Sequence, residues 1–367
     1  MTSRRTVLKT ALGGAALALL PTPAAAQGSK LPAIVADHLR RLADAGAPGA
    51  VIGAIGRGGQ HIAGIGSLGP QDKRTPDART VFQIGSVTKT FTALLLARAV
   101  QGGRVALDAP LQRYLPPDLV LPRADITVEQ AATHSSGLPA LPPNLATAPG
   151  FDPANPYAHY TRQDLAAGLP ATVPVSEPGT SYLYSNLAMG LLGQALSNVY
   201  RADYPTAVQR HITHPLGLRD ITTTLTRDQS GRKATGHDGT GKPVPDWEIP
   251  TLAGAGALYG TAQDVLRYLR DHLDATPGSL RPALRLVQQP RFSPPEIPGL
   301  RLGLAWHLLP LPTTGNTMVW HNGETGGFRS FAGFSPSTRT AVVVLASGTG
   351  VDTDSAGSGL LDTLDRA

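Results

Sequence analysis

Hydrophobic and polar positions follow different spacings in the first hundred residues. In residues 31–46, LPAIVADHLRRLADAG, apolar residues recur every three or four positions until a glycine, which predicts a helix. Residues 49–69, GAVIGAIGRGGQHIAGIGSLG, contain apolar runs on either side of glycines and predict two strands joined by a turn. Residues 82–100, FQIGSVTKTFTALLLARAV, form an apolar run that predicts a second helix.

The last part of the chain predicts a sheet. Three strand candidates, NTMVWHNG, FRSFAGFSP and RTAVVVLAS, occupy residues 316–323, 328–336 and 339–347 and are separated by short turns. An amphipathic stretch, residues 353–366, predicts a final helix. Another helix is expected from Gly254 onward, in the stretch that contains GALYGTAQDVLRYLRDHL.

The middle of the chain has a different composition. Proline and glycine are dense between residues 110 and 178, which predicts short helices and long loops. Strands at both ends with helices between them predict an α/β lobe built from residues 27–97 and 256–367. Residues 98–255 are then expected to form an inserted, mainly helical lobe.

The N-terminus has the pattern of an export signal. The pair Arg4-Arg5 precedes an apolar run from Ala11 to Leu20 and then the small residues Ala24–Ala26. A membrane anchor is the alternative, but ten apolar residues are too few to span a bilayer. We therefore expect residues 1–26 to be a twin-arginine signal peptide, and the mature protein to be periplasmic or secreted without a stable membrane anchor.

Charge and cysteine content exclude several functions. The formal net charge is +6, and Arg4, Arg5 and Lys9 supply three of those charges, which leaves +3 on the mature chain. There is no basic run with interleaved aromatic residues, so a nucleic-acid partner is not expected. The chain contains no cysteine, which excludes disulfides, a lipoprotein anchor and thiol chemistry.

Ser86 and Lys89 form the first candidate for catalytic chemistry. They are three residues apart at the start of the apolar helix, so their side chains are expected on one face. A lysine in partly apolar surroundings loses preference for its charged form and can act as a base. The first backbone N–H groups of a helix also have no partner within the helix, so they are free to bind an oxyanion near Ser86. The alternative is that Ser86 only begins the helix.

Two further motifs accompany this pair. Tyr184-Ser185-Asn186 lies between a Pro-Gly turn and a predicted helix. Its tyrosine could move a proton and its asparagine could hold a substrate carbonyl, or the two could be a core aromatic residue and an N-cap. His321 and Gly323 are two apart on a predicted strand and face the same way. A glycine in a strand permits close approach of a ligand backbone.

Together these motifs resemble those of the penicillin-recognising serine enzymes. In chain order they are Ser86-x-x-Lys89, Tyr184-x-Asn186 and His321-x-Gly323. The tyrosine version is similar to class C β-lactamases and the related DD-carboxypeptidases and esterases. The phrases ATHSSGLP, HPLGLRDITTT and GETGGFRSFAGFSP also resemble that family. The resemblance implies an antiparallel sheet flanked by helices plus an inserted all-helical lobe.

The resemblance also implies roles for these residues. Ser86 is expected to be the nucleophile, and Lys89 and Tyr184 are expected to act as a coupled base. The backbone N–H groups of Ser86 and Glu324 would hold the oxyanion. No metal or organic cofactor is implied.

Substrate binding is the second group of implied roles. Asn186 would orient the substrate amide, and the strand that contains His321 and Gly323 would pair with the substrate. With a charged imidazole, His321 would also attract a substrate carboxylate.

Two positions depart from the class C pattern. The third motif begins with His321 where those β-lactamases usually have lysine, and LASGTG, residues 345–350, lacks their usual asparagine. We therefore expect an exported serine hydrolase that acts through an acyl-enzyme on β-lactams, D-Ala-D-Ala peptides of peptidoglycan, or both. The alternatives are an esterase on the same scaffold and a catalytically silent cell-wall binding protein.

Other patterns are weaker. GIGSLG, residues 64–69, fits a dinucleotide-binding pattern but is not followed by a helix. His211 and His214 could share a helical face as metal ligands, but no third ligand is evident, and packing or capping is the preferred interpretation.

Overall fold

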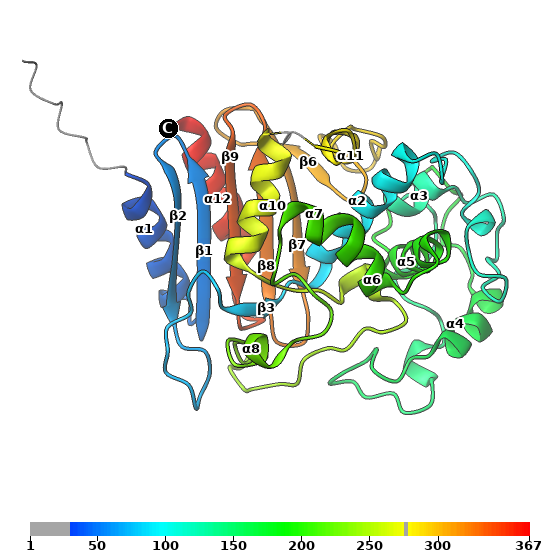
Figure 1. Ribbon diagram of the computed structural model, residues 1–367, viewed down its shortest axis with the longest axis horizontal. Coiled ribbons are helices and arrows are strands. Elements are labelled where there is room, and N and C mark those ends of the chain that lie inside the picture. Colours follow the sequence, from blue (N-terminus) through cyan, green and yellow to red (C-terminus); the bar gives the residue numbers. More distant parts are fainter. Residues whose placement is uncertain (1–29, 275–277) are drawn as a thin grey trace, which may run out of the picture.

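A seven-stranded antiparallel sheet forms one side of the molecule (Figure 1). The computed structural model describes residues 30–274 and 278–367. The strand order across the sheet is β2-β1-β9-β8-β7-β6-β5. The strands are β1 (Gly49–Gly56), β2 (Gly59–Gly66), β5 (Arg301–Leu302), β6 (His307–Pro310), β7 (Thr317–Glu324), β8 (Arg329–Ser335) and β9 (Thr340–Ala346).

Strands from the two ends of the chain pair with each other inside this sheet. Strand β1 pairs with β9 in a register that runs from Ala50 opposite Ala346 to Ile55 opposite Ala341. The strands predicted near the N-terminus and the three predicted near the C-terminus are all present and pair antiparallel. The predicted fold class, an antiparallel sheet flanked by helices, is confirmed.

Both faces of the sheet are buried. Along β9, Val342 and Val344 pack in one apolar cluster, with helices α1 (Leu31–Asp44) and α12 (Thr353–Arg366). The intervening residue Val343 packs in the larger cluster on the opposite face, with α10 (Ala262–Asp274). Figure 1 shows α10 in front of the sheet and α12 behind it. The alternation of side chains along a strand thus gives the sheet two hydrophobic faces.

The middle of the chain supplies short helices and long loops. The helices that follow α2 (Thr88–Gln101) are α3 (Val128–Ala132), α4 (Arg162–Gly168), α5 (Asn186–Tyr200), α6 (Tyr204–Val208), α7 (His214–Leu216), α8 (Arg227–Ser230), α9 (Ala253–Gly256) and, after α10, α11 (Arg281–Val287). Eleven of the fourteen residues of α2 are buried, because this helix lies against α5, α9 and α11. Helix α2 is therefore central in the molecule.

One predicted helix is divided. The helix expected from Gly254 onward is in fact α9, then strand β4 (Tyr259–Thr261), then α10. Strand β4 pairs with β3 (Val81–Gln83), and Tyr259 also forms a bridge with Thr222. These partners are far away in the sequence, so local spacing does not reveal the strand.

Some expectations about domains and targeting remain predictions. The large sheet takes its strands from residues 49–66 and 301–346, and helices α3 to α9 come from residues 128–256. The boundaries near residues 97 and 255 stay a prediction. The signal peptide expected at residues 1–26 lies outside the described residues. Within residues 30–274 and 278–367, no helix combines the length and apolar character that crossing a bilayer requires.

Candidate active site

Ser86 lies in a tight turn that leads into α2. Strand β3 ends at Gln83, and residues Gly85–Val87 form one turn of 3₁₀ helix before α2 begins. Gly85 has a φ of +49°, and a Cβ atom there would lie 2.6 Å from the backbone nitrogen of Glu324. Only glycine avoids both this strain and this clash. The turn therefore holds Ser86 against the end of β7.

Gly323 completes this contact from the other side. A Cβ atom on Gly323 would lie 2.1 Å from the carbonyl oxygen of Ile84 and 2.9 Å from the backbone nitrogen of Ser86. Ser330, on the neighbouring strand β8, donates a hydrogen bond of 2.8 Å to the same Ile84 carbonyl. The sequence predicted that Gly323 allows a ligand backbone to approach β7. In the structure, the turn that contains Ile84 and Ser86 occupies that side of the strand. The backbone nitrogens of Ser86 and Glu324 consequently meet at one junction.

Lys89 is completely buried directly behind Ser86. Its Nζ atom lies 2.8 Å from Ser86 Oγ, 2.7 Å from Asn186 Oδ1 and 2.7 Å from the carbonyl oxygen of Ala255 in α9. Burial lowers the pKa of Lys89 well below its ordinary value. A charged ammonium group could donate a hydrogen bond to all three oxygens. A neutral amine donates to two of them and accepts a hydrogen bond from the Ser86 hydroxyl. Burial favours the second arrangement.

Tyr184 lies beside this pair. Its ring centroid is 4.7 Å from Lys89 Nζ. Burial raises the pKa of its phenol, and a hydrogen bond with Ser86 opposes part of that rise. The residue after Tyr184 is the N-cap of α5, where Ser185 Oγ accepts a 2.9 Å hydrogen bond from the Ala188 N–H. The N-cap fixes the position at which the chain enters α5. It therefore also fixes the positions of Tyr184, which precedes Ser185, and of Asn186, which follows it.

Asn186 has two partners within the protein. Its Oδ1 accepts from Lys89 and its Nδ2 donates to the Tyr157 hydroxyl at 3.4 Å. Ser185, not Asn186, is the N-cap that the alternative interpretation assigned to this motif. Asn186 still lines the cleft beside Ser86. Its carbonyl oxygen accepts from Lys89 and one of its two amide hydrogens points to Tyr157, which leaves one N–H for a substrate.

His321 lies behind the cleft wall. Its side chain has no exposed surface and does not line the cleft, which differs from the expected contact with a substrate carboxylate. Its ring centroid is 6.1 Å from that of Tyr184 and 5.1 Å from that of His307. Burial, then His307 and Lys89, lower the pKa of His321 well below its ordinary value. The imidazole is therefore neutral and cannot attract an anion.

Three aromatic residues that sequence reasoning missed lie around Tyr184. The His134 ring centroid is 4.4 Å from that of Tyr184, and its Nδ1 accepts a 3.1 Å hydrogen bond from the Ser185 N–H. The Tyr182 hydroxyl lies 2.9 Å from His307 Nε2. Burial lowers the pKa of His134, and that of His307 to about 4. His134 lies in the phrase ATHSSGLP, but its φ of +56° could not be foreseen from those letters.

A cleft of about 570 Å³ opens above Ser86. The residues that line it are Ser86, Tyr182, Tyr184, Asn186, Trp247, Ile297, Leu300, His307, Leu309, Trp320, Asn322, Gly323 and Glu324. Of the residues proposed from the sequence, the cleft wall thus includes Ser86, Tyr184, Asn186, Gly323 and Glu324, while Lys89 and His321 lie beneath it.

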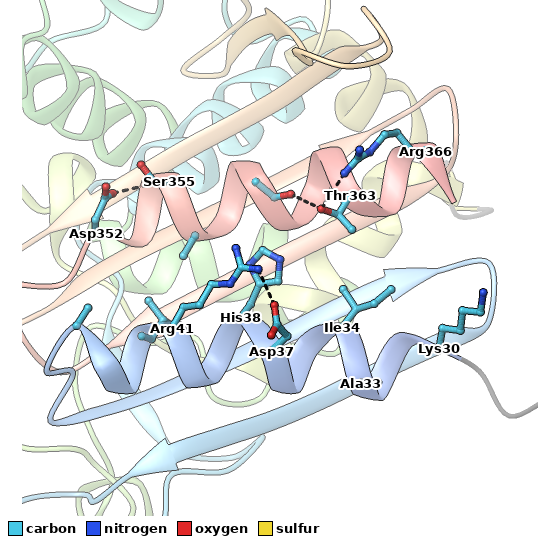
Figure 2. A pocket seen from close by; sticks show the side chains of 14 residues that line it. Lys30, Ala33, Ile34, Asp37, His38, Arg41, Asp352, Ser355, Thr363 and Arg366 are labelled. Carbon is cyan, nitrogen blue, oxygen red and sulfur yellow. Dashed lines mark hydrogen bonds and ion pairs between the residues drawn. The ribbon is translucent and has the colours of Figure 1, made fainter.

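A larger cavity, about 850 Å³, lies elsewhere, between α1 and α12 (Figure 2). Its serine, Ser355, donates its backbone N–H to Asp352 at the start of α12, and Figure 2 shows Lys30 at the far end of the cavity from Ser355. No nucleophile and base are paired there, so the smaller cleft is the candidate active site.

Metal ligation has no support in the described residues. No group of three or more histidine, aspartate or glutamate side chains within residues 30–274 and 278–367 is placed to hold a metal ion. His211 instead stacks on Tyr200, with ring centroids 4.2 Å apart.

This fold and site define a serine hydrolase of the β-lactamase and DD-peptidase type: a sheet with helices on both faces, and a buried lysine against Ser86. The chain belongs to the Beta-lactamase family, which it matches over residues 35–364. It is 28% identical over 341 residues to the D-alanyl-D-alanine-carboxypeptidase/endopeptidase AmpH of Escherichia coli K12, a match that covers 88% of this chain and 86% of that protein. It is 25% identical over 329 residues to a β-lactamase of Pseudomonas fluorescens, covering 81% and 88%.

Solved structures show the same fold. A class C β-lactamase superposes with a TM-score of 0.81 at 22% identity, over 93% of this chain and 97% of that chain. The D-alanine carboxypeptidase AmpC from Burkholderia cenocepacia superposes with a TM-score of 0.78 at 24% identity, over 91% and 99%.

Proposed function

We propose that this protein is an exported hydrolase that is acylated at Ser86 by β-lactams, by D-alanyl-D-alanine peptides, or by both. The observation that carries the proposal is the buried Lys89 amine, 2.8 Å from Ser86 Oγ and held by two further oxygens. The names of the relatives, a D-alanyl-D-alanine carboxypeptidase and a β-lactamase, support these two substrate classes. The same attack on a carbonyl carbon serves both substrates.

In the first step, Lys89 and Tyr184 act together in proton transfer, with Lys89 as the proton acceptor and Tyr184 as the donor to the leaving group. The lone pair of the neutral lysine accepts the Ser86 proton while Oγ forms a bond to the substrate carbonyl carbon. Tyr184 remains a protonated phenol at neutral pH because burial raises its pKa, so it can pass a proton to the leaving group as the carbonyl–leaving-group bond breaks. The proton that Lys89 took from Ser86 then passes to the Tyr184 oxygen, which restores a neutral amine and a protonated phenol.

The oxyanion formed in that step requires donors. The backbone N–H groups of Ser86 and Glu324 meet where β7 contacts the turn before α2. Removing one such donor typically costs about 3–4 kcal/mol in the activation barrier. In the second step, water attacks the acyl carbon and the neutral Lys89 takes a proton from it. The Lys89–Tyr184 pair returns that proton to Ser86 Oγ as the bond between Oγ and the acyl carbon breaks.

The silent-protein alternative conflicts with the position of Lys89. Burying an amine without a carboxylate partner costs free energy, which a binding protein could avoid with an apolar side chain. The esterase alternative is favoured by one observation: no lysine or arginine is among the described residues that line the cleft.

Export by the twin-arginine route belongs to the same proposal. Arg4-Arg5, the apolar run and Ala24–Ala26 support cleavage after Ala26 and a periplasmic or secreted mature protein.

The test is covalent labelling followed by peptide mapping. The purified protein is incubated with a fluorescent penicillin and, separately, with an uncharged activated ester, and the acyl mass is located by mass spectrometry. We expect it on the peptide that contains Ser86, and we expect Ser86→Ala to lose it. The control Ser337→Ala, at an exposed turn between β8 and β9, should be labelled like the wild type. An adduct that persists in Ser86→Ala would overturn the proposal.

A further inference from the structure

The side chains that line the cleft are mostly apolar or aromatic. Two tryptophans, Trp247 and Trp320, and three aliphatic residues, Ile297, Leu300 and Leu309, account for much of the wall. Its wall also contains an acid, Glu324, and no lysine or arginine lines it among the described residues. The cleft is therefore suited to apolar groups and offers no cation from its lining residues.

The basic groups near the cleft do not change this picture. Lys89 has no exposed surface and its amine already contacts three oxygens. His134 and His321 are fully buried, and burial lowers the pKa of both, as it does for His307 in the wall. All three imidazoles are neutral at neutral pH, so none provides a counter-ion for a substrate.

Arg329, opposite Glu324 at the β7–β8 turn, is already paired. Its Nη2 lies 3.0 Å from Glu324 Oε2, and both side chains are partly exposed. The pair has no net charge, and Arg329 is not among the residues that line the cleft. A substrate anion would have to displace Glu324 from this ion pair to be compensated.

We propose that the cleft selects acyl donors whose leaving group has no carboxylate: neutral esters and amidated or esterified D-alanyl peptides with an apolar group. This inference rests on the proposed function, because it assumes acylation of Ser86. A carboxylate that enters an apolar wall beside Glu324 loses water and gains no cation. An uncharged leaving group keeps the apolar contacts without that loss. Ordinary β-lactams and free D-alanyl-D-alanine acids carry such a carboxylate, so they are expected to be the poorer substrates.

The test uses two esters that differ in one charge. Both carry a phenylacetyl group, one on 3-hydroxybenzoic acid and the other on 3-hydroxybenzamide, so the reacting bond and the size of the leaving group are matched. We expect kcat/KM to be at least about tenfold higher for the benzamide ester. A carboxylate ester that reacts as fast as the benzamide ester, or faster, would overturn the inference. If Arg329→Gln then removed this preference for the carboxylate ester, Arg329 would be the cation that binds the carboxylate.

A variant tests whether charge is the cause. Ile297 lines the cleft and is 38% exposed, so a longer polar side chain can be accommodated there. Ile297→Lys should raise kcat/KM for the carboxylate ester relative to the benzamide ester by roughly fivefold or more, the effect of two opposite charges about 4 Å apart in bulk water. The neutral control Ile297→Met should keep the wild-type ratio. An unchanged ratio in Ile297→Lys would show that charge does not set the preference.

The two proposals fail in different ways. If neither ester and no fluorescent penicillin places an acyl group on Ser86, the proposed function is wrong. If Ser86 is acylated but the carboxylate ester reacts as fast as the benzamide ester or faster, only the inference about the cleft is wrong.

Discussion

The carbonyl oxygen of Ala255 lies 2.7 Å from the Nζ atom of Lys89. Ala255 belongs to α9, a four-residue helix that is 166 positions away along the chain. With Asn186 Oδ1, also at 2.7 Å, it occupies two of the three bonding directions of the amine. The third direction points to Ser86 Oγ. A backbone atom of the helical segment thus orients the base toward the nucleophile.

Lys89 and Tyr184 should be non-additive in acylation. Lys89→Met and Tyr184→Phe are each expected to slow acylation about 10²–10⁴-fold, because each removes part of one proton-transfer unit. The double variant should be little worse than the poorer single variant. Stopped-flow acylation rates, with thermal unfolding of each variant as the control for folding, measure this. Losses that multiply would mean that the two groups work independently.

The pH dependence of acylation should reveal the lowered pKa of Lys89. A base with a lysine's ordinary pKa of about 10.4 would make the rate rise tenfold per pH unit through the neutral range. Burial lowers the pKa of Lys89 well below that value, which favours the neutral amine. We therefore expect the acylation rate with an uncharged ester to stop rising at a pH well below about 10.4. A tenfold rise per unit that continues toward about pH 10 would show that the pKa of Lys89 is not lowered.

Gly85→Ala should destroy acylation. The alanine would have to adopt a φ of +49°, and its Cβ atom would lie 2.6 Å from the Glu324 nitrogen. The turn must therefore move away from β7, which separates the two oxyanion donors. We expect a loss of at least about 10²-fold in kcat/KM, the typical cost of one donor, together with a lower melting temperature.

Gly359→Ala is the matched control for that substitution. Gly359 lies within α12, and a Cβ atom there would meet nothing within 4 Å. Activity should be unchanged and stability should rise by about 0.5–1 kcal/mol, because glycine is a poorer helix residue than alanine. If Gly85→Ala behaved like this control, the contact between the turn and β7 would not matter for catalysis.

The sequence predicted the parts of this molecule that depend on local spacing. Ser86 and Lys89 are brought together by one turn of helix, and strands β7, β8 and β9 follow from short alternating or apolar runs. The strands that were missed, β3, β4, β5 and β6, are two to four residues long, too short to show a spacing. Strands β3 and β4 are also defined by each other across a long stretch of chain, whereas β5 pairs with the nearby β6 and β6 with β7.

Long-range packing explains what was missed in the site. Tyr182 is two residues before Tyr184, but His134 and His307 join these tyrosines only because separate segments of the chain converge there, and nothing in the sequence around either histidine signals this. The burial of His321 has the same origin: an alternating pattern gives the face of a strand, but what covers that face depends on the rest of the fold.

Export can be tested with the first residues of the chain. Replacing Arg4 and Arg5 with lysines should keep the uncleaved precursor inside the cell, because the twin-arginine route reads that pair. The wild-type protein should be recovered outside the cytoplasm with Gln27 as its first residue. A lysine variant that is exported normally would indicate the general secretion route.

The final prediction concerns the titration of His321. An imidazole with its ordinary pKa of about 6.5 that faced a substrate carboxylate would make kcat/KM for carboxylate substrates fall as pH rises through that value. The groups around His321 are His307 on β6, Lys89 on α2, His134 after α3 and Tyr184 before α5. Burial, followed by His307 and Lys89, lowers the pKa of His321 and so moves this titration to more acidic pH. The carboxylate and benzamide esters should therefore show parallel pH profiles from mildly acidic to mildly alkaline conditions. His321→Asn, which cannot titrate, should leave the difference between the two profiles unchanged, whatever it does to the rates themselves. Profiles that diverge near pH 6.5 in the wild type and become parallel in His321→Asn would mean that substrate binding charges His321, and that this histidine recognises the carboxylate after all.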